Sequence, residues 1–217
     1  MPNVWIAIEG PCCAGKSTLG TNLLNCLGAD RVVLVPDYAD FVGGGSGMPD
    51  PDPQSLVEEL LALDRLLDIE VQRFSACQDL MTRDRLVLID RSVVTLLGHC
   101  AGLDCRSEPH ETVLDDALSF LQQDHRSVWP THIIYLDVDG NTQNQRNRGK
   151  FPDGSIFMDP VFNEGFRGFF DSYFWALPGR SGMWLNGAGS QRDILSGAMR
   201  LIDSLSGQTS NEGVGLA

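Results

Sequence analysis

The sequence predicts an α/β fold in which a five-stranded parallel sheet carries helices on both faces. Short apolar segments alternate along the chain with longer segments of helical periodicity, and strands that are joined through helices cross over and lie parallel. The first apolar segment, residues 4–9, runs into a glycine-bounded turn that a helix follows. Asp90 comes directly after one of the other segments, and Asp37 follows another with only Pro36 between them. They are therefore expected at the edge of the sheet where open α/β folds bind their ligands.

Each element follows from its own periodicity. The strands are short apolar runs, expected at residues 4–9, 31–35, 86–89, 133–136 and 183–185. Apolar residues spaced three or four apart predict helices at 19–27, 54–83, 93–102, 111–123, 141–148, 160–174 and 193–205. The apolar stripe of the longest helix is expected at Val57, Leu60, Leu61, Leu67, Val71 and Phe74. The glycine- and proline-rich stretch 42–53 is predicted to be a loop.

The length and composition fit a single domain at residues 1–205, followed by a flexible tail at 206–217. The chain has 217 residues, of which 42% are hydrophobic and 21% charged, as in globular proteins. Its net charge of −13 argues against a broad surface for nucleic acid or an anionic membrane, and no apolar run is long enough to span a bilayer. Six cysteines without metal-site spacing predict reduced thiols and a cytoplasmic location.

The strongest functional signal is the phosphate-loop pattern G-x-x-x-x-G-K-S between the first strand and the first helix. Its backbone N–H groups and the helix dipole form a nest for polyphosphate. Gly15 lets the backbone approach closely, Lys16 reaches the β- and γ-phosphates, and the Ser17 hydroxyl is a ligand for Mg²⁺. We therefore expect ATP and Mg²⁺ as cofactors. The predicted nucleotide-binding residues are Gly10, Pro11, Cys12, Cys13, Ala14, Gly15, Lys16, Ser17 and Thr18.

Three polar residues after the strands are further candidates. Asp90 is expected to hold Mg²⁺ together with Ser17, and the alternative is a carboxylate that caps the next helix. The bidentate guanidinium of Arg91 suits phosphate or carboxylate, and the alternative is a surface ion pair. Asp37 is a candidate general base for a hydroxyl acceptor, and the alternative is a turn residue after Pro36.

Residues 146–158 are predicted to form a lid. Arg146, Arg148 and Lys150 run into a segment that glycine and proline interrupt, and a flexible cationic flap can close over a transferring phosphate and exclude water. The alternative is a solvated run of charges. Arg65, in the long helix, either faces the acceptor pocket or pairs with Asp68 on an exposed face.

Taken together, these motifs resemble the thymidylate kinase and deoxynucleoside kinase group of phosphate-loop kinases. The resemblance covers residues 4–202 and rests on Glu9-Gly10 before the loop, on the segment ELLALDR at 59–65, on Asp90-Arg91-Ser92 and on the strand PTHIIYLDV at 130–138. It implies a three-layer P-loop fold with a lid segment. It also implies lid arginines at 146 and 148, and a homodimer through the long helix.

The chain departs from the thymidylate kinase pattern at three places. Those kinases commonly carry an Asp in the loop, where this chain has Pro11-Cys12-Cys13, and an Arg after the second strand, where it has Pro36-Asp37. Their base-stacking Phe is Leu61 here. Asp37 instead resembles the Glu with which deoxynucleoside kinases accept a proton from a hydroxyl, although the order of proline and carboxylate is reversed.

We therefore expect a kinase that transfers the γ-phosphoryl group of ATP to a nucleoside-like or nucleotide acceptor, with a hydroxyl favoured as the receiving group. The expected catalytic residues are Lys16, Asp37, Arg91, Arg146 and Arg148. Asp37, Arg65 and Arg91 are expected to contact this small-molecule acceptor. Two alternatives stay open: a phosphotransferase for a non-nucleoside alcohol, such as an antibiotic or a biosynthetic intermediate, and a nucleotide-binding regulator without catalysis.

Overall fold

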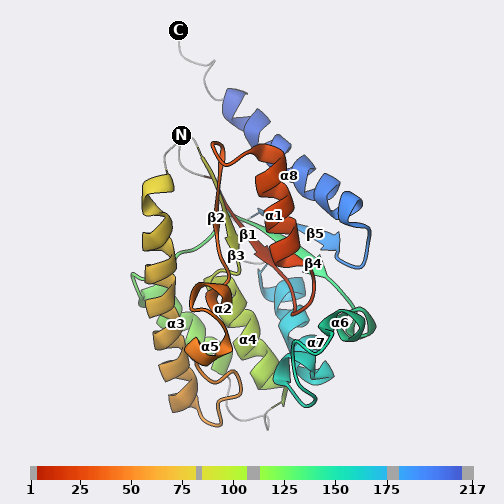
Figure 1. Cartoon of the computed structure of the whole chain (residues 1–217). Helices are drawn as coiled ribbons and strands as arrows, with labels where there is room; N and C mark the ends of the chain where they lie inside the picture. Colours follow the sequence, from red (N-terminus) through yellow and green to blue (C-terminus); the bar gives the residue numbers. More distant parts are fainter. Residues whose placement is uncertain (1–3, 82–84, 107–112, 175–180, 212–217) are drawn as a thin grey trace.

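Five parallel strands form one sheet in the order β2-β3-β1-β4-β5 (Figure 1). The computed structural model describes residues 4–81, 85–106, 113–174 and 181–211. The strands are β1 (Trp5–Glu9), β2 (Val32–Val35), β3 (Leu86–Asp90), β4 (His132–Asp137) and β5 (Ser181–Asn186). All four pairings between neighbouring strands are parallel. The expected α/β fold with a five-stranded parallel sheet is therefore confirmed.

Helices connect the strands, as parallel pairing requires. The longer ones are α1 (Lys16–Leu27), α3 (Leu56–Cys77), α4 (Val93–Arg106), α5 (Val113–Gln123) and α8 (Gln191–Asn211). The shorter ones are α2 (Tyr38–Phe41), α6 (Gly140–Asn147) and α7 (Pro160–Gly168), and α7 continues into a π-helical turn at Phe169–Phe174. Among the described residues, no helix has the length and apolar character needed to cross a membrane.

The sheet separates two hydrophobic cores, which gives the molecule three layers (Figure 1). Side chains alternate between the two faces of a strand. Ile6 and Ile8 of β1 pack in the core that α1 and α8 cover, whereas Ala7 packs in the larger core under α3, α4, α5 and α7. Because both faces of the sheet are covered, its strands are continuous apolar runs, which is why the sequence located them well.

The predicted apolar stripe of α3 is wrong in part. Val57, Leu61 and Val71 are 68%, 64% and 42% exposed. The buried face of the helix instead includes Leu63, Leu67 and Phe74, together with the charged residues Glu59, Glu70 and Arg73. Charged side chains on the inner face interrupt the repeat of apolar residues, so the sequence pattern assigned exposed residues to the buried face of the helix.

Several helix boundaries also differ from the predicted ones. α3 ends at Cys77, and a 3₁₀ turn at Gln78–Leu80 follows it. α8 continues to Asn211, beyond the expected end at residue 205, and residues 212–217 of the expected tail lie outside the described residues. The sequence did not predict α2, a single turn in which the Asp37 side chain accepts a hydrogen bond from the backbone N–H of Ala39.

Helices α4 and α7 approach each other closely because glycines lie at their contact. A Cβ on Gly165 would lie 2.5 Å from the carbonyl oxygen of Ala101, and a Cβ on Gly102 would lie 2.6 Å from the ring of Phe162. Both distances are too short for a carbon atom. The contact therefore fixes α7 against α4, the helix that begins just after β3.

Gly165→Ala is expected to lower the free energy of unfolding by about 1–3 kcal/mol, because the added methyl group overpacks this contact. Gly168 lies in the same helix, but its Cβ would meet open space. Gly168→Ala is therefore expected to raise the free energy of unfolding by about 0.5–1 kcal/mol. Urea unfolding of the two variants checks both values, and equal effects at the two positions would contradict the close packing.

Candidate functional site

A glycine-bounded loop joins β1 to α1. Gly10 has a φ of 137°, and a Cβ at this position would clash with the carbonyl oxygen of Leu136. Gly15, with a φ of 100°, immediately precedes α1, and Cys13 between them has a φ of 62°. Left-handed residues within such a loop turn successive backbone N–H groups to one side, which forms an anion-binding concavity. The backbone thus has the form that the sequence motif predicts.

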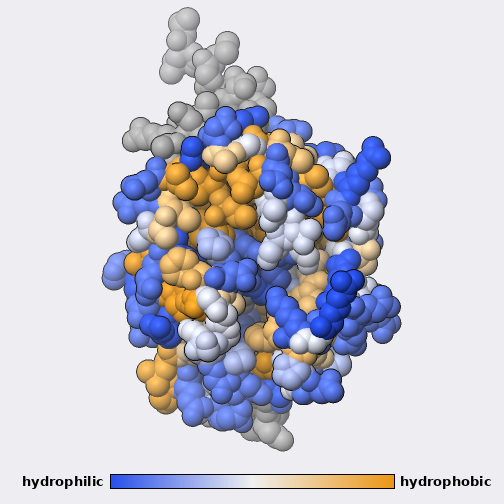
Figure 2. Space-filling model, in the orientation of Figure 1, coloured by the Kyte–Doolittle hydropathy of each residue, from blue (hydrophilic) through white to orange (hydrophobic). Residues whose placement is uncertain are grey.

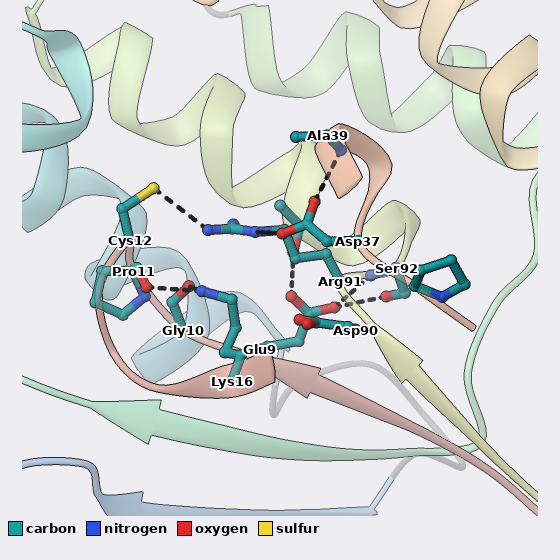
Figure 3. Close-up of polar contacts among 12 residues, drawn as sticks. Glu9, Gly10, Pro11, Cys12, Lys16, Asp37, Ala39, Asp90, Arg91 and Ser92 are labelled. Atoms are coloured by element: carbon teal, nitrogen blue, oxygen red, sulfur yellow. Dashed lines mark hydrogen bonds and ion pairs between the residues drawn. The ribbon is translucent and has the colours of Figure 1, made fainter. Parts of the chain in front are cut away.

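Lys16, the first residue of α1, is buried and turns back into the loop. Its Nζ donates hydrogen bonds to the carbonyl oxygens of Gly10 at 3.0 Å and Pro11 at 2.8 Å (Figure 3). Burial, helped by the charge of Arg91, lowers the pKa of Lys16 to about 8. Because an ammonium group binds ionised phosphate oxygens more strongly than neutral carbonyls, a polyphosphate can displace these two contacts.

The loop borders a cavity of about 460 Å³ whose walls also come from α1, α6 and the turn after β5. In Figure 2, hydrophilic residues cover the part of this face where α6 lies. Among the described lining residues, the cations are Lys16, Arg91, Arg146 and Lys150, and the only carboxylate is Asp37. The cavity therefore has a positive balance in a chain whose net charge is −13, which suits an anionic ligand.

Asp37 and Arg91 form an ion pair at this cavity. Arg91 Nε lies 3.0 Å from Asp37 Oδ2, and Arg91 Nη2 donates to Cys12 Sγ at 3.4 Å (Figure 3). Burial raises the pKa of Asp37, but the charges of Arg91 and Lys16 outweigh this effect and hold that pKa below its usual value. Asp37 is therefore ionised at neutral pH. Its other oxygen caps α2, so the carboxylate serves the turn and the cavity at once.

Asp90 ends β3 and lies beneath the loop with 3% of its surface exposed. Its Oδ1 has no hydrogen-bond partner in the described part of the chain. Burial raises the pKa of this carboxyl, while Lys16 and the Ser17 hydroxyl oppose the rise. A buried carboxylate oxygen without a partner, beside a hydroxyl, is a suitable donor set for a hard cation. Ser17 and Asp90 therefore fit Mg²⁺.

The described residues contain no group of three or more His, Cys, Asp or Glu side chains that could hold a metal ion. This finding is compatible with Mg²⁺ at Ser17 and Asp90, because Mg²⁺ usually keeps several waters and binds through one or two protein oxygens together with substrate phosphates.

Only some of the residues predicted for the lid line the cavity. Arg146, in α6, lines the cavity, and its Nη1 donates to the carbonyl oxygen of Ala14 at 3.1 Å. Lys150 also lines the cavity. Arg148 ends α6 in a left-handed conformation with a φ of 44°, is exposed, and is not among the described residues that line the cavity. Its catalytic role stays a prediction that would require the segment to move.

Arg65 lies on an exposed part of α3 and is not among the described residues that line the cavity. Its alternative partner Asp68 is bound instead by Arg126, whose Nη1 lies 2.8 Å from Asp68 Oδ1. Arg126 also pairs with Asp64 on the same helix. The sequence-based role of Arg65 in acceptor binding stays a prediction.

Glu9 and Gln143 are two of the buried polar residues to which the sequence assigned no role. Glu9, at the end of β1, accepts hydrogen bonds from the backbone N–H of Ser92 at 2.9 Å, from the Ser92 hydroxyl at 2.7 Å and from the Thr95 hydroxyl. Gln143 of α6 donates to the carbonyl oxygen of Cys12 at 3.1 Å. Glu9 thereby ties β1 to the start of α4, and Gln143 ties α6 to the loop. Two sequence signals pointed to Glu9: it closes an apolar strand, and with Gly10 it opens the phosphate-loop pattern.

The sequence matches no described protein family and no curated protein. The fold is similar to solved structures of deoxyadenosine kinase from M. mycoides. The structure with bound dATP gives a TM-score of 0.61 at 14% identity, covering 93% of this chain and 100% of that chain. Structures with the products dCMP and dCDP, and with dCTP, give TM-scores of 0.60 and 0.57 at the same identity and coverage. The chain therefore shares the three-layer α/β fold of these structures.

The lowered pKa of Lys16 predicts how the cavity binds an anion at different pH values. Sulfate, whose charge is constant in this range, favours the protonated amine and so raises the pKa of Lys16 in the complex. The dissociation constant for sulfate is therefore expected to stay level below pH 8. Above the free-state pKa of about 8 it is expected to rise, by up to about tenfold per pH unit.

An NMR titration with sulfate at several pH values measures this dependence. Lys16→Met is the control, because it removes the titrating group. This variant is expected to bind sulfate more weakly at every pH and without the rise above pH 8. The same rise in Lys16→Met would contradict the assignment to Lys16.

Proposed function

We propose that this protein is an ATP- and Mg²⁺-dependent kinase that transfers the γ-phosphoryl group to a hydroxyl group of a nucleoside-like acceptor. The observation that carries the proposal is the meeting of Lys16, Asp37 and Arg91 at one cavity. A cation for the donor phosphates, a carboxylate for the acceptor and a guanidinium between them are the groups that phosphoryl transfer needs. One oxygen of Asp37 caps α2, but a protein that only held a nucleotide would not need the other oxygen to face the cavity.

The donor phosphates would lie in the loop between β1 and α1. Lys16 would exchange its two carbonyl partners for phosphate oxygens, and Arg146 would add charge from the side of α6. Ser17 and Asp90 would hold Mg²⁺, which neutralises phosphate charge during transfer. Because these groups act mainly by position and charge, the rate depends on how firmly the loop and the strand ends hold them.

Asp37 is the proposed base, and its ion pair with Arg91 regulates its strength. While Arg91 is bound to Asp37, the pKa of the carboxyl is low, and the carboxylate is a weak base. If Arg91 turns to the transferring phosphoryl group, Asp37 loses its strongest positive partner and its pKa rises. The carboxylate would therefore become a better proton acceptor as negative charge develops on the phosphoryl group.

The choice of a hydroxyl acceptor rests on the charge of Asp37. A carboxylate attracts the proton of a hydroxyl, whereas it repels an acceptor phosphate. The likeness in fold to deoxyadenosine kinase supports a nucleoside-like acceptor. A non-nucleoside alcohol is the competing acceptor class. ADP formation with nucleosides, nucleoside monophosphates and small alcohols distinguishes these three groups of acceptor.

Asp37→Asn is expected to lower kcat with the best alcohol acceptor by about 10²–10⁴-fold, because it removes the general base. The dissociation constant for ATP is expected to stay close to that of the wild type. Lys16→Ala is the comparison: it is expected to weaken both ATP binding and transfer, since Lys16 contacts the donor. Faster phosphorylation of a nucleoside monophosphate than of any alcohol, with little effect of Asp37→Asn, would refute the proposed acceptor chemistry.

The cysteines of the loop offer a test of where ATP binds. Cys12 and Cys13 line the cavity, whereas Cys26 and Cys105 are exposed on α1 and α4. ATP is expected to slow the alkylation of Cys12 and Cys13 by iodoacetamide and to leave the rates at Cys26 and Cys105 unchanged. Mass spectrometry of the digested protein measures all four rates in one sample. Saturating ATP without protection of the loop cysteines would place the nucleotide elsewhere.

A further inference from the structure

Arg73 of α3 is an arginine side chain with no exposed surface. Its guanidinium pairs with the equally buried carboxylate of Glu70 at 2.6 Å, and its Cζ lies 3.7 Å from the centre of the Tyr38 ring. A buried arginine is costly unless its charge and its N–H groups are all matched. Such a residue therefore needs an explanation beyond the packing of α3.

The remaining N–H groups of Arg73 bind the backbone where two neighbouring strands end. Nη1 donates to the carbonyl oxygen of Pro36 at 2.7 Å, just after β2, and to that of Asp90 at 3.1 Å, at the end of β3. Nη2 donates to the carbonyl oxygen of Arg91 at 2.5 Å. One guanidinium thus joins the segments that carry Asp37 and Arg91.

The ladder between β2 and β3 does not reach these two segments. Its last pair is Val35 and Ile89. The end of β3 is held from the side of β1, where the Arg91 N–H donates to the carbonyl oxygen of Ile8 at 3.2 Å. The link from the end of β3 to Pro36 therefore comes from Arg73. Arg91 also has a φ of 62°, a left-handed conformation that is unfavourable for a residue with a side chain and persists only when its surroundings enforce it. The hydrogen bond from Arg73 to the Arg91 carbonyl is one such contact.

Arg73 does not touch the cavity, because it is not among the described lining residues. Its charge contributes to the low pKa of Asp37, but less than the charges of Arg91 and Lys16 do. Its main connection with the site is therefore geometric. The planar fork of arginine can bind three carbonyl oxygens and one carboxylate together, whereas the ammonium group of lysine cannot span them.

We propose that Arg73 is the positioning residue that sets the distance and orientation of the Asp37–Arg91 pair. This inference rests on the proposed function, in which that pair acts on the acceptor and the transferring phosphoryl group. Without the guanidinium of Arg73, the side chains of Asp37 and Arg91 would still be present, but they would no longer be aligned with each other. A misplacement of about 1 Å at such a pair can reduce the rate on the order of 10²-fold.

The test combines kinetics with NMR of ¹⁵N-arginine-labelled protein. The Nε–H signal of Arg91 is assigned by its loss in Arg91→Lys, and in the wild type it exchanges slowly with water because it donates to Asp37. Arg73→Lys is expected to speed this exchange and to lower kcat on the order of 10²-fold, with the KM for ATP near that of the wild type. If Arg73→Lys does not fold, Glu70→Leu with Arg73→Met removes both buried charges together, a type of exchange that folded proteins tolerate.

Arg126→Met is the matched control, because Arg126 is also an ion-paired arginine against α3. Its guanidinium binds the side chains of Asp64, Asp68 and Asp124, none of which is among the described residues that line the cavity. The control variant is expected to leave both the Arg91 signal and kcat unchanged. An Arg91 signal of unchanged position and exchange rate in the Arg73 variants would overturn the positioning role. Absence of phosphoryl transfer by the wild type would refute the proposed function, while the exchange measurement would still decide the role of Arg73.

Discussion

The site depends on the pairing of charges that are buried at the carboxyl ends of β1, β2 and β3. Glu9, Lys16, Glu70, Arg73 and Asp90 are all at most 5% exposed. Removing an ionised group from water costs several kcal/mol unless hydrogen bonds or an opposite charge replace the lost hydration. Glu9, Lys16 and Arg73 find these partners on the loop and on neighbouring strand ends and helices, and the partners fix where the strand ends and the loop lie. Asp90 Oδ1 is left without a partner among the described residues.

The partners fall into two kinds, and the difference connects the structure with its proposed chemistry. Arg73 and Glu9 bind backbone groups and side chains that a ligand does not displace. These contacts hold the strand ends and the start of α4 in position. Lys16 binds two loop carbonyls and Arg91 binds Asp37, and a polyphosphate or a transferring phosphoryl group can replace each of these partners. The contacts that hold the strand ends are thus different from the contacts that a bound ligand would replace.

Much of the fold and the core of the site could be predicted because their signals are local. The phosphate loop is eight consecutive residues, and its backbone geometry follows from glycines at fixed positions. Asp37, Asp90 and Arg91 follow apolar strands, and parallel strands bring their carboxyl ends to one edge. Sequence and topology together were therefore sufficient to place these residues near one another.

The rest depends on contacts between distant parts of the chain. Arg73 meets Pro36 and Asp90 only after α3 packs against the sheet, and nothing in its neighbourhood in the sequence distinguishes it from Arg65 on the exposed face. Charged residues on the buried face of α3 also made the apolar pattern of that helix predict a buried face that is wrong in part. Functional charges in a core produce this error, because hydrophobic periodicity assumes that the inner face is apolar.

The central claim is that the loop between β1 and α1 holds phosphate groups in place of the carbonyl partners of Lys16. A crystal structure with a non-hydrolysable ATP analogue and Mg²⁺ tests it most directly. We expect the phosphates within the loop, Lys16 Nζ bound to phosphate oxygens, and its bonds to Gly10 and Pro11 broken. An analogue bound outside the loop, with Lys16 still on those two carbonyls, would contradict it.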